Sequence, residues 1–299
     1  MPTNEQRREA AKRKLERQLE RRAERGRRRR LQVLSAVVGV VVLVGGVALV
    51  VSLTRGGNSN TAAGATSAAT PTAPATSTGP STPAPAPVAL PAGRTTPLAP
   101  TVDCTFTPST GQPAAKANTA PAGTATSTQG TIAVTMTTSA GAVPLTLDRT
   151  LAPCTVASFL SLTTQKYFDG TPCHRLTTQG IKVLQCGDPA GTGKGGPGYT
   201  FANEFPTDQF PTGDPAAQNS ATYPRGTLAM ANAGPGTNGS QFFLVYGDSP
   251  LPPQYTVFGS IGAAGLSVLD AVAAAGTSTG SGDGAPKTPV TITTMTAAA

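Results

Sequence analysis

A run of 23 residues without a charge, "LQVLSAVVGVVVLVGGVALVVSL" at 31–53, most constrains what this chain can fold into. As a helix, such a run is long enough to cross the roughly 30 Å hydrocarbon core of a bilayer. Basic residues crowd its N-terminal flank, whereas only Arg55 follows it closely. The positive-inside rule therefore predicts a cytoplasmic tail at 1–30, one transmembrane helix at 31–53 and an extracytoplasmic remainder, anchored in the cell membrane. The alternative, a cleaved signal peptide, usually has a shorter basic region and a shorter apolar run.

The tail accounts for the basic character of the whole chain. It holds 13 Arg or Lys and five Glu, and this net charge of 13 − 5 = +8 equals that of all 299 residues. The remaining residues carry ten basic and ten acidic side chains, so they have no excess of positive charge. Because a nucleic-acid-binding domain needs a basic face of its own, we expect no nucleic-acid partner. The tail is interpreted as a topology signal that lies against anionic lipid.

Residues 54–128 are mostly Ala, Thr, Pro, Ser and Gly. A segment of this composition buries too little apolar surface to offset the entropy lost on ordering, so it predicts a disordered linker. Cys104 and Phe106 are exceptions and indicate a small anchored patch inside the linker. The folded domain is then expected at 129–299, which is long enough to form one solid core.

Four cysteines, Cys104, Cys154, Cys173 and Cys186, are present. In an extracytoplasmic chain, cysteines are expected to form disulfides rather than to bind metal. Three pairings are possible and the sequence does not choose among them; our prediction is Cys173–Cys186 with Cys104–Cys154. The spacing around His174 does not fit a zinc site, and "TGKGG" lacks the Ser or Thr of a P-loop, so we expect no metal and no nucleotide cofactor.

Short runs rich in Thr, Val and Ile, separated by glycine turns, dominate the domain. The pattern predicts hairpins and single strands at 130–148, 171–189, 226–232, 240–247, 255–261 and 288–296. Apolar residues at helical spacing predict helices at 152–168 and 263–275. Seven or eight short strands with two helices favour a mostly-β fold, an antiparallel sheet closed as a barrel, because closure removes exposed edges.

The residue inventory disfavours hydrolytic chemistry. His174 is the only histidine, and no Ser or Cys is tied to it at the spacing of a catalytic triad. We interpret it as a hydrogen-bonded core residue. The acidic residues Asp188, Glu204 and Asp208 lie in loops and show no signature of a paired carboxylate site.

The residues that remain suit a reaction without a covalent step. Arg175 follows the histidine, Gln185 lies across the predicted hairpin, and strand alternation sends Phe242 and Phe243 to opposite faces, so that one of them lines a cleft. Rotation about an X–Pro bond faces a barrier of about 18–20 kcal/mol, which amide resonance creates. A donor directed at the prolyl nitrogen binds a lone pair that only the twisted state offers, and so stabilises the transition state selectively.

Four segments, "PCHRL", "VLQCGD", "GTLAMANAGPGTNGSQFFLVYG" and "YTVFGSI", resemble the motifs of cyclophilin-type peptidyl-prolyl cis–trans isomerases, in the same order, over about 130–296. The resemblance implies an eight-stranded barrel capped by two helices and an isomerase that needs no cofactor and acts on proline-containing polypeptides. The anchor and linker are similar to those of membrane-anchored cyclophilins of actinobacteria, which implies secreted or envelope substrates. The alternative function is a holdase that binds proline-containing segments with negligible turnover.

The resemblance also implies roles for single residues. Arg175 is the expected catalytic donor, and Gln185 is expected to bind the substrate backbone. The expected substrate-binding residues are Ile181, Val183, Ala231, Asn232, Gln241, Phe243, Leu251 and Tyr255. Between His174 and Gln185 the chain is two residues longer than the common form of the family, so Ile181 and Val183 are both candidates for one pocket position. There is no Trp, and Pro250 and Tyr255 stand where many members have Trp and His; we expect activity to persist and cyclosporin to bind weakly.

Overall fold

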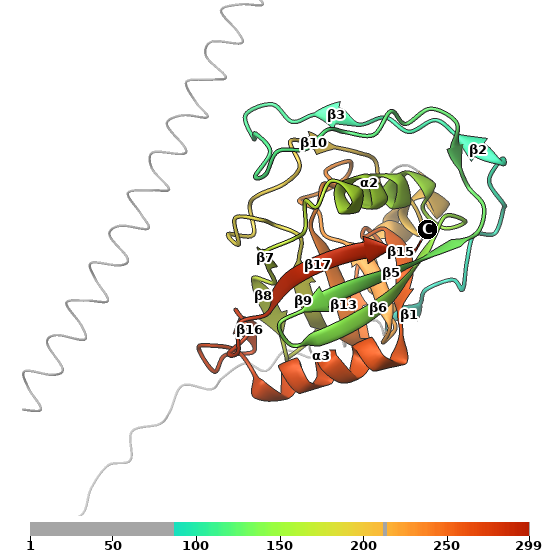
Figure 1. Cartoon of the computed structure of the whole chain (residues 1–299). Coiled ribbons are helices and arrows are strands. Elements are labelled where there is room, and N and C mark those ends of the chain that lie inside the picture. The colour runs from blue at the N-terminus through green and yellow to red at the C-terminus, as the bar shows by residue number, and fades with distance from the viewer. Residues whose placement is uncertain (1–86, 212–213, 299) are drawn as a thin grey trace, which may run out of the picture. The chain divides into compact units, whose positions relative to one another are not determined.

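The computed structural model describes residues 87–211 and 214–298 (Figure 1). The predicted tail and transmembrane helix, and the predicted linker up to residue 86, lie outside the described residues. Within the described ranges, no helix has both the length and the apolar character that a bilayer-spanning segment needs.

One curled antiparallel sheet of ten strands forms the body of the domain (Figure 1). In sheet order the strands are β16 (Asp283–Gly284), β8 (Arg175–Thr177), β9 (Lys182–Cys186), β13 (Phe242–Gly247), β12 (Thr227–Met230), β15 (Val257–Ile261), β6 (Gly141–Asp148), β5 (Thr131–Thr138), β17 (Thr291–Ala297) and β7 (Thr171–Pro172). Eight of them have three or more residues, which agrees with the strand number implied by the family resemblance.

The prediction of a closed barrel is wrong in one respect, because no ladder joins the two end strands, β16 and β7, in the described sheet. The chain itself bridges this gap, since it passes from β7 into β8 through Cys173 and His174. The Cys173 backbone N–H donates to the Val290 carbonyl at 2.8 Å, which keeps the bridging residues against the sheet. A proline in β7, which has no N–H to donate, fits the end of a ladder.

The β5–β6 hairpin shows why the alternating pattern predicted strands. Its eight register pairs run from Thr131 opposite Asp148 to Thr138 opposite Gly141. Alternate residues of both strands are buried and their neighbours are exposed, as in a sheet with one face on the core. The predicted hairpin at 130–148 is confirmed, and the strands predicted at 226–232, 240–247, 255–261 and 288–296 correspond to β12, β13, β15 and β17.

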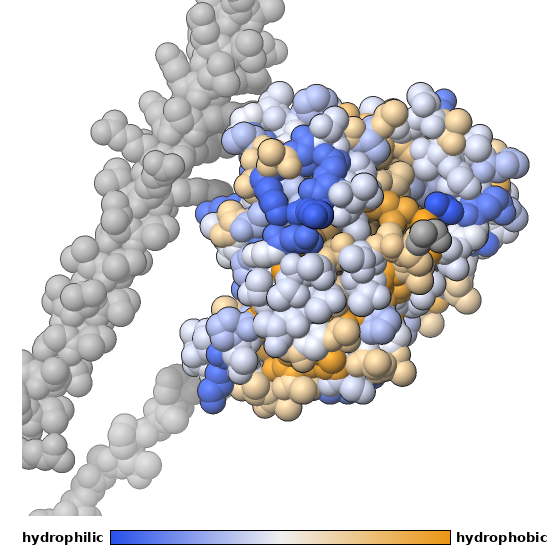
Figure 2. Space-filling view, in the orientation of Figure 1, coloured by the Kyte–Doolittle hydropathy of each residue, from blue (hydrophilic) through white to orange (hydrophobic). Residues whose placement is uncertain are grey.

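Two α-helices cover the sheet at opposite ends, α2 (Pro153–Thr164) and α3 (Ala263–Ala275) (Figure 1). Helix α3 has the predicted bounds, and its outer side presents a mildly hydrophobic, alanine-rich surface (Figure 2). Helix α2 ends four residues before the predicted position. Lys166 adopts a left-handed conformation (φ 55°), which turns the chain so that Tyr167 and Phe168 enter the core instead of continuing the helix.

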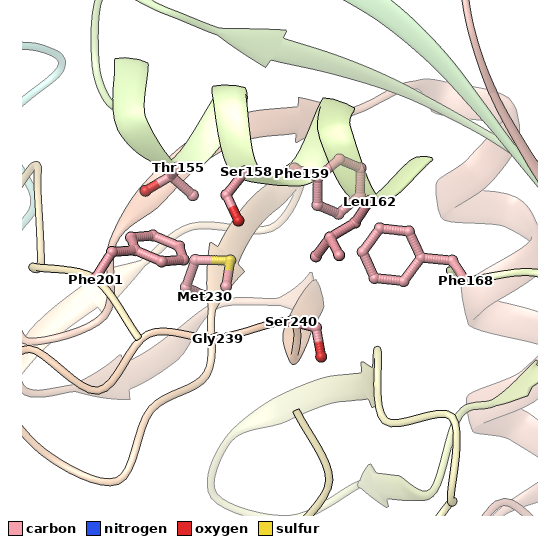
Figure 3. Close-up of a pocket in the computed structure, with 9 residues that line it drawn as sticks. All are labelled: Thr155, Ser158, Phe159, Leu162, Phe168, Phe201, Met230, Gly239 and Ser240. Atoms are coloured by element: carbon pink, nitrogen blue, oxygen red, sulfur yellow. The ribbon is translucent and has the colours of Figure 1, made fainter. Parts of the chain in front are cut away.

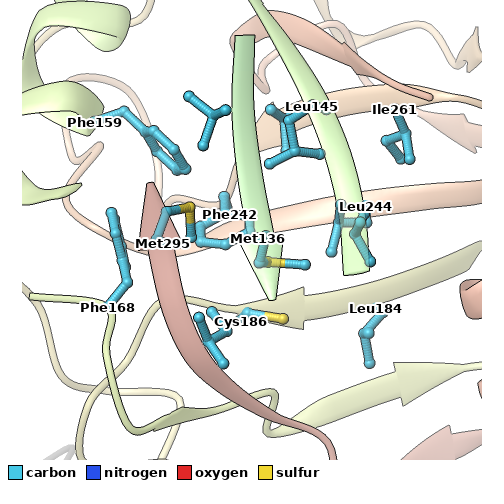
Figure 4. Packing of buried hydrophobic residues seen from close by; sticks show 14 of the residues in the cluster. Met136, Leu145, Phe159, Phe168, Leu184, Cys186, Phe242, Leu244, Ile261 and Met295 are labelled. Carbon is cyan, nitrogen blue, oxygen red and sulfur yellow. The ribbon is translucent and has the colours of Figure 1, made fainter. Parts of the chain in front are cut away.

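An interior apolar cluster fills the space between α2, α3 and the concave side of the sheet (Figure 4). Phe159 of α2 contacts three other rings of this cluster, with ring centroids 4.9 Å from Phe168, 5.3 Å from Phe242 and 5.2 Å from Phe258. Such aromatic contacts add about 0.5–1.5 kcal/mol each to the energy of burial. Phe242 is therefore the member of the Phe pair that faces the core.

The N-terminus of α2 is capped from a distant loop. Its N-cap residue, Ala152, offers no side-chain acceptor. The buried Glu204 carboxylate instead accepts hydrogen bonds from the backbone N–H groups of Cys154 (3.0 Å) and Thr155 (2.8 Å) and from the Thr155 hydroxyl (2.6 Å). A carboxylate at this end also interacts favourably with the helix dipole.

We expect Glu204→Ala to lower the free energy of unfolding by about 2–3 kcal/mol, because it leaves one buried and one part-buried helix N–H group without this partner. Glu204→Gln retains one acceptor oxygen and should lose only about 1 kcal/mol. Urea denaturation of both variants measures the difference. Equal losses would contradict a capping role for the side chain.

The prediction of a disordered linker is wrong for residues 87–128, the N-terminal strap. The strap carries four two-residue strands, β1 (Val88–Ala89), β2 (Thr101–Val102), β3 (Thr107–Pro108) and β4 (Thr126–Ser127). β2 pairs with β4, β3 with β10 (Tyr199–Thr200), and β1 with β11 (Ala221–Tyr223), which in turn pairs with β14 (Ser249–Leu251). Two 3₁₀ helices, Thr207–Gln209 and Pro215–Gln218, complete the described elements.

A few anchors hold the strap despite its composition. The Cys104–Cys154 disulfide ties it to α2, and the Phe106 ring packs edge-on against Tyr199 and Phe201, with centroids 5.6 and 5.5 Å away. Arg94 forms an ion pair with Asp208 at 2.6 Å. The anchored patch predicted at Cys104 and Phe106 is confirmed, and so is the disulfide pairing, because Cys173 and Cys186 form the second bond.

Candidate active site

A row of side chains, the outer row, crosses five strands on the outer, convex side of the sheet. The register places Arg175 opposite Gln185, Gln185 opposite Phe243, Phe243 opposite Ala229 and Ala229 opposite Val257. Residues directly opposite each other in a ladder share a face of the sheet, with Cβ atoms about 4.5–5.5 Å apart. The adjacent register positions hold the interior leucines, namely Leu176, Leu184, Leu244 and Leu228. Strand pairing alone therefore brings the predicted donor, its glutamine and the predicted pocket phenylalanine together.

The apolar part of this row belongs to an outer apolar cluster, separate from the interior one. Its buried members are Val183, Phe205, Tyr223, Ala229, Phe243, Val245 and Val257, and the partly buried ones are Leu90, Leu151, Ile181, Ala231, Leu251 and Tyr255. Six of the eight predicted substrate-binding residues are in this cluster, both candidates for the ambiguous pocket position included. The rings of Phe243 and Tyr255 meet edge to face, with centroids 5.6 Å apart.

Three predicted polar residues form a chain of hydrogen bonds beside the outer apolar cluster. Arg175 Nη1 donates to Gln185 Oε1 at 3.4 Å, Gln185 Nε2 donates to Gln241 Oε1 at 2.9 Å, and Gln241 Nε2 donates to the Gly195 carbonyl at 2.9 Å. Each amide accepts on its oxygen and donates from its nitrogen, so both amides are held in one orientation. The Arg175 side chain keeps 40% of its surface exposed, so solvent or a ligand has access to it.

Asp283 is a site residue that the sequence did not reveal. Its carboxylate accepts from Arg175 Nε at 2.8 Å and from Nη2 at 2.7 Å, because the short strand β16 pairs with β8. These bonds raise the pKa of Arg175 and lower the pKa of Asp283. The guanidinium is therefore a fixed positive charge across the physiological range of pH.

The remaining predicted residue, Asn232, lies just beyond the end of β12 and outside the hydrogen-bond chain. Its Nδ2 donates to the Gln254 carbonyl at 2.9 Å, and its Oδ1 accepts from the Gly234 N–H at 3.1 Å. The side chain thus shapes the loop that follows β12, which leaves only its backbone for the predicted contact with substrate.

The glycine loop at 187–198 is built around the buried carboxylate of Asp188. This carboxylate accepts from the N–H groups of Ala190 (2.8 Å), Thr192 (2.9 Å) and Gly195 (3.1 Å), and from the Thr192 hydroxyl (3.0 Å). Burial raises the pKa of Asp188, but these hydrogen bonds outweigh it and the net pKa is lowered. The loop is thereby fixed around a protein carboxylate, and its Gly195 carbonyl orients Gln241.

The interpretation of His174 as a hydrogen-bonded core residue is wrong. It is half-buried, and neither ring nitrogen finds a partner among the residues that the structure describes. The nearby Gly193 has no side chain that would offer one. Burial lowers the pKa of His174, so the imidazole is neutral at neutral pH and supplies no charge to the site.

The pocket in Figure 3 lies elsewhere, between α2 and the sheet. It is a gap in the packing of the interior cluster and has no ionisable side chain in its wall. Its lining residues are Thr155, Ser158, Phe159, Leu162, Phe168, Phe201, Met230, Gly239 and Ser240.

We expect kcat/KM for a prolyl peptide to change by less than about twofold between about pH 7 and pH 9. The pKa of His174 is lowered from 6.5, so this residue is already neutral at the lower limit, and the charge of Arg175 persists beyond the upper one. Exchange NMR in buffers of constant ionic strength measures the profile. A bell-shaped curve within this range would indicate acid–base catalysis instead.

Residues 133–297 match the family of cyclophilin type peptidyl-prolyl cis-trans isomerases. A probable peptidyl-prolyl cis-trans isomerase B of Mycobacterium leprae is 53% identical over 195 residues, which are 65% of this chain and 66% of that protein. Its namesake in Mycobacterium tuberculosis is 59% identical over 165 residues, which are 55% of this chain and 54% of that protein. The chain thus spans between half and two thirds of the length of these relatives.

A cyclophilin type peptidyl-prolyl cis-trans isomerase of Cryptosporidium parvum, known from its crystal structure, is 28% identical; the alignment covers 57% of this chain and 99% of that one, with a TM-score of 0.46. The family match covers more than half of the 299 residues and contains the whole of the outer row. This chain is therefore a member of the cyclophilin-type peptidyl-prolyl cis–trans isomerase family.

Proposed function

We propose that the domain accelerates cis–trans isomerisation of X–Pro bonds, with Arg175 as the donor to the prolyl nitrogen. The observation that carries this proposal is an accessible guanidinium held at the edge of the outer apolar cluster. A guanidinium has five N–H donors. Three of them are used by Asp283 and Gln185, so two remain without a partner among the described residues.

The chemistry requires only that these donors meet the twisted amide. Resonance makes the prolyl nitrogen a poor acceptor in the planar states, and twisting restores its lone pair. The hydrogen bond from Arg175 therefore forms in the transition state and not in either ground state, which raises kcat. An acceleration of about 10⁵-fold corresponds to about 7 kcal/mol, and a charged donor combined with fixed substrate geometry accounts for an effect of that size.

The neighbouring residues have distinct parts in this proposal. The proline ring packs on the outer apolar cluster at Phe243, Leu251 and Tyr255, with Ile181 or Val183 beside it. Gln185 uses one of its two Nε2 hydrogens for Gln241. The other has no partner in the described part of the chain and can bind a substrate carbonyl. The backbone at Ala231 and Asn232 pairs with the substrate chain, and no metal or cofactor takes part.

We further propose that the protein is anchored by residues 31–53, with residues 1–30 in the cytoplasm and the domain outside. Its substrates are then secreted or envelope polypeptides that contain proline. The charge-free run and its basic flank support this placement. Two disulfides in the domain fit an oxidising compartment.

An isomerase assay on the purified full chain tests the proposed activity. The protein should accelerate exchange in a short Ala-Pro peptide, measured by exchange NMR, at substoichiometric concentration. A holdase would bind the peptide and leave its exchange rate per bound molecule unchanged. That second outcome would replace the isomerase with a binding module.

We expect cyclosporin to bind weakly. Tyr255 fills the position where many relatives have His, and its ring is held against Phe243, while Pro250 lies within β14 where many relatives have Trp. Titration followed by inhibition of the exchange rate checks this expectation. Nanomolar affinity would contradict it.

A further inference from the structure

Asp283 holds the Arg175 guanidinium along one edge, through two N–H groups at once. Its two oxygens accept from Arg175 Nε (2.8 Å) and Nη2 (2.7 Å), which is the planar, bidentate geometry of a strong Arg–carboxylate pair. The remaining contact, from Nη1 to Gln185, is 3.4 Å long and lies at the limit of a hydrogen bond. Gln185 alone is therefore a poor restraint on the orientation of the guanidinium.

The orientation of the guanidinium matters because its N–H donor must point at the one lone pair that the prolyl nitrogen has when the amide is twisted. An arginine side chain has several rotatable bonds, so holding it in one orientation costs rotamer entropy when nothing fixes it beforehand. A donor misplaced by about 1 Å costs about 10²-fold in rate. The carboxylate fixes the plane of the guanidinium before the substrate arrives, and leaves its two unused N–H groups directed away from β16.

The same carboxylate also opposes catalysis, because a negative charge beside the donor weakens its positive potential. Asp283 is 56% exposed, however, and solvent and salt screen the field of such a group strongly. Solvent and salt do not weaken in this way the restraint that the two hydrogen bonds place on the position of the guanidinium. The restraint on orientation therefore outweighs the loss of potential.

We propose that Asp283 is a positioning residue, which acts through Arg175 and holds its free N–H groups in line with the prolyl nitrogen. This inference rests on the proposed function and adds a residue to it. Asp283 itself does not touch the substrate.

The test uses Asp283→Ala in the full chain. The variant should lower kcat by about tenfold with KM within about twofold, because the donor survives but loses its orientation. Added formate fills the space of the missing carboxylate and can accept from the same Nε and Nη2 groups. Formate at increasing concentration should restore most of the lost kcat in a saturable manner, whereas chloride at equal ionic strength should not.

Asp270 provides a matched control. Its carboxylate also forms a bidentate pair, accepting from Arg225 Nη1 and Nη2, both at 2.7 Å. Asp270 is 52% exposed, but it lies on α3 away from the site. Asp270→Ala should leave kcat and KM unchanged and should not respond to formate. A formate effect in this variant would be nonspecific and would overturn the inference.

Asp283→Asn keeps one acceptor oxygen at the same place and should lose only about threefold in kcat. The assignment is overturned if Asp283→Ala keeps the full rate, or if it loses activity that formate does not restore, since that loss would come from a disturbed loop around β16. Failure of the proposed function looks different. In that case the wild-type chain itself has no turnover, whereas a failed inference leaves the wild type active and dependent on Arg175.

Discussion

Arg175→Ala should lower kcat/KM for an Ala-Pro peptide by about 10²–10³-fold, the loss found when a transition-state donor is removed from an active site. The effect should fall on kcat, because the planar ground states offer the guanidinium no lone pair on the prolyl nitrogen. Peptide affinity should change little, since the outer apolar cluster remains intact. Exchange NMR measures both quantities on the same sample.

Arg175→Lys and Arg225→Lys serve as the paired controls. The first keeps the positive charge but replaces the fork with a single ammonium, which cannot satisfy Asp283 and Gln185 and still face the substrate, so most of the activity should be lost. The second makes the same change at the fork with Asp270, on the surface at α3, and should keep the wild-type rate. If Arg175→Ala retained more than about a tenth of the wild-type kcat/KM, Arg175 would not be the main donor.

Replacing Cys104 and Cys154 by alanine should lower the free energy of unfolding by about 4 kcal/mol. The bond joins residues 50 positions apart, and the entropy that a disulfide removes from the unfolded chain grows with the length of the closed loop. The loss should also release the N-terminal strap from α2, because the disulfide is its covalent anchor. Urea denaturation gives the energy, and amide hydrogen exchange at residues 101–128 reports the release.

Replacing Cys173 and Cys186 provides the comparison. These residues are 13 positions apart, so the same relation gives about 3 kcal/mol. This smaller loss should not change exchange in the strap. Unfolding energies in the reverse order, or a strap that stays protected without its disulfide, would show that the apolar contacts of Phe106 anchor it instead.

Most of the sheet could be predicted because its signals are local. The hairpin at 130–148 alternates in a strict period of two, and α3 follows a helical period bounded by glycines. The strap could not be predicted in the same way, because average composition hides a few strong anchors. Its anchors are one disulfide, one aromatic side chain and one ion pair, and the sequence indicates only the first two of them.

The site residues also differ in this respect: local motifs predict some of them, whereas others depend on contacts between distant parts of the chain. Motifs predict Arg175, Gln185 and Phe243 as site residues. Strand alternation predicts that Phe242 and Phe243 lie on opposite faces, and their places in the interior and outer clusters confirm this. Asp283 was missed because it lies 108 positions from Arg175, in a glycine-rich loop that shows no pattern. In the sequence Glu204 is only an acid in a loop, without the pattern of a carboxylate pair. Its capping role does not show there, because its partner is the backbone of a helix 49 positions away.

The outer row limits where residues can be inserted into or deleted from such a domain. Each of its residues is a chain neighbour of a core residue. Shifting β8, β9 or β13 by one position toward the neighbouring leucine would therefore put Leu176, Leu184 or Leu244 in the place of Arg175, Gln185 or Phe243. Length variation is thus confined to the bends. The bend between His174 and Gln185, which the resemblance implies is two residues longer than the common family form, leaves Arg175 opposite Gln185. Gly180 at this bend has a left-handed conformation (φ 71°). An insertion of an even number of residues at such a bend leaves every strand residue on its own side of the sheet, so neither the core nor the site changes.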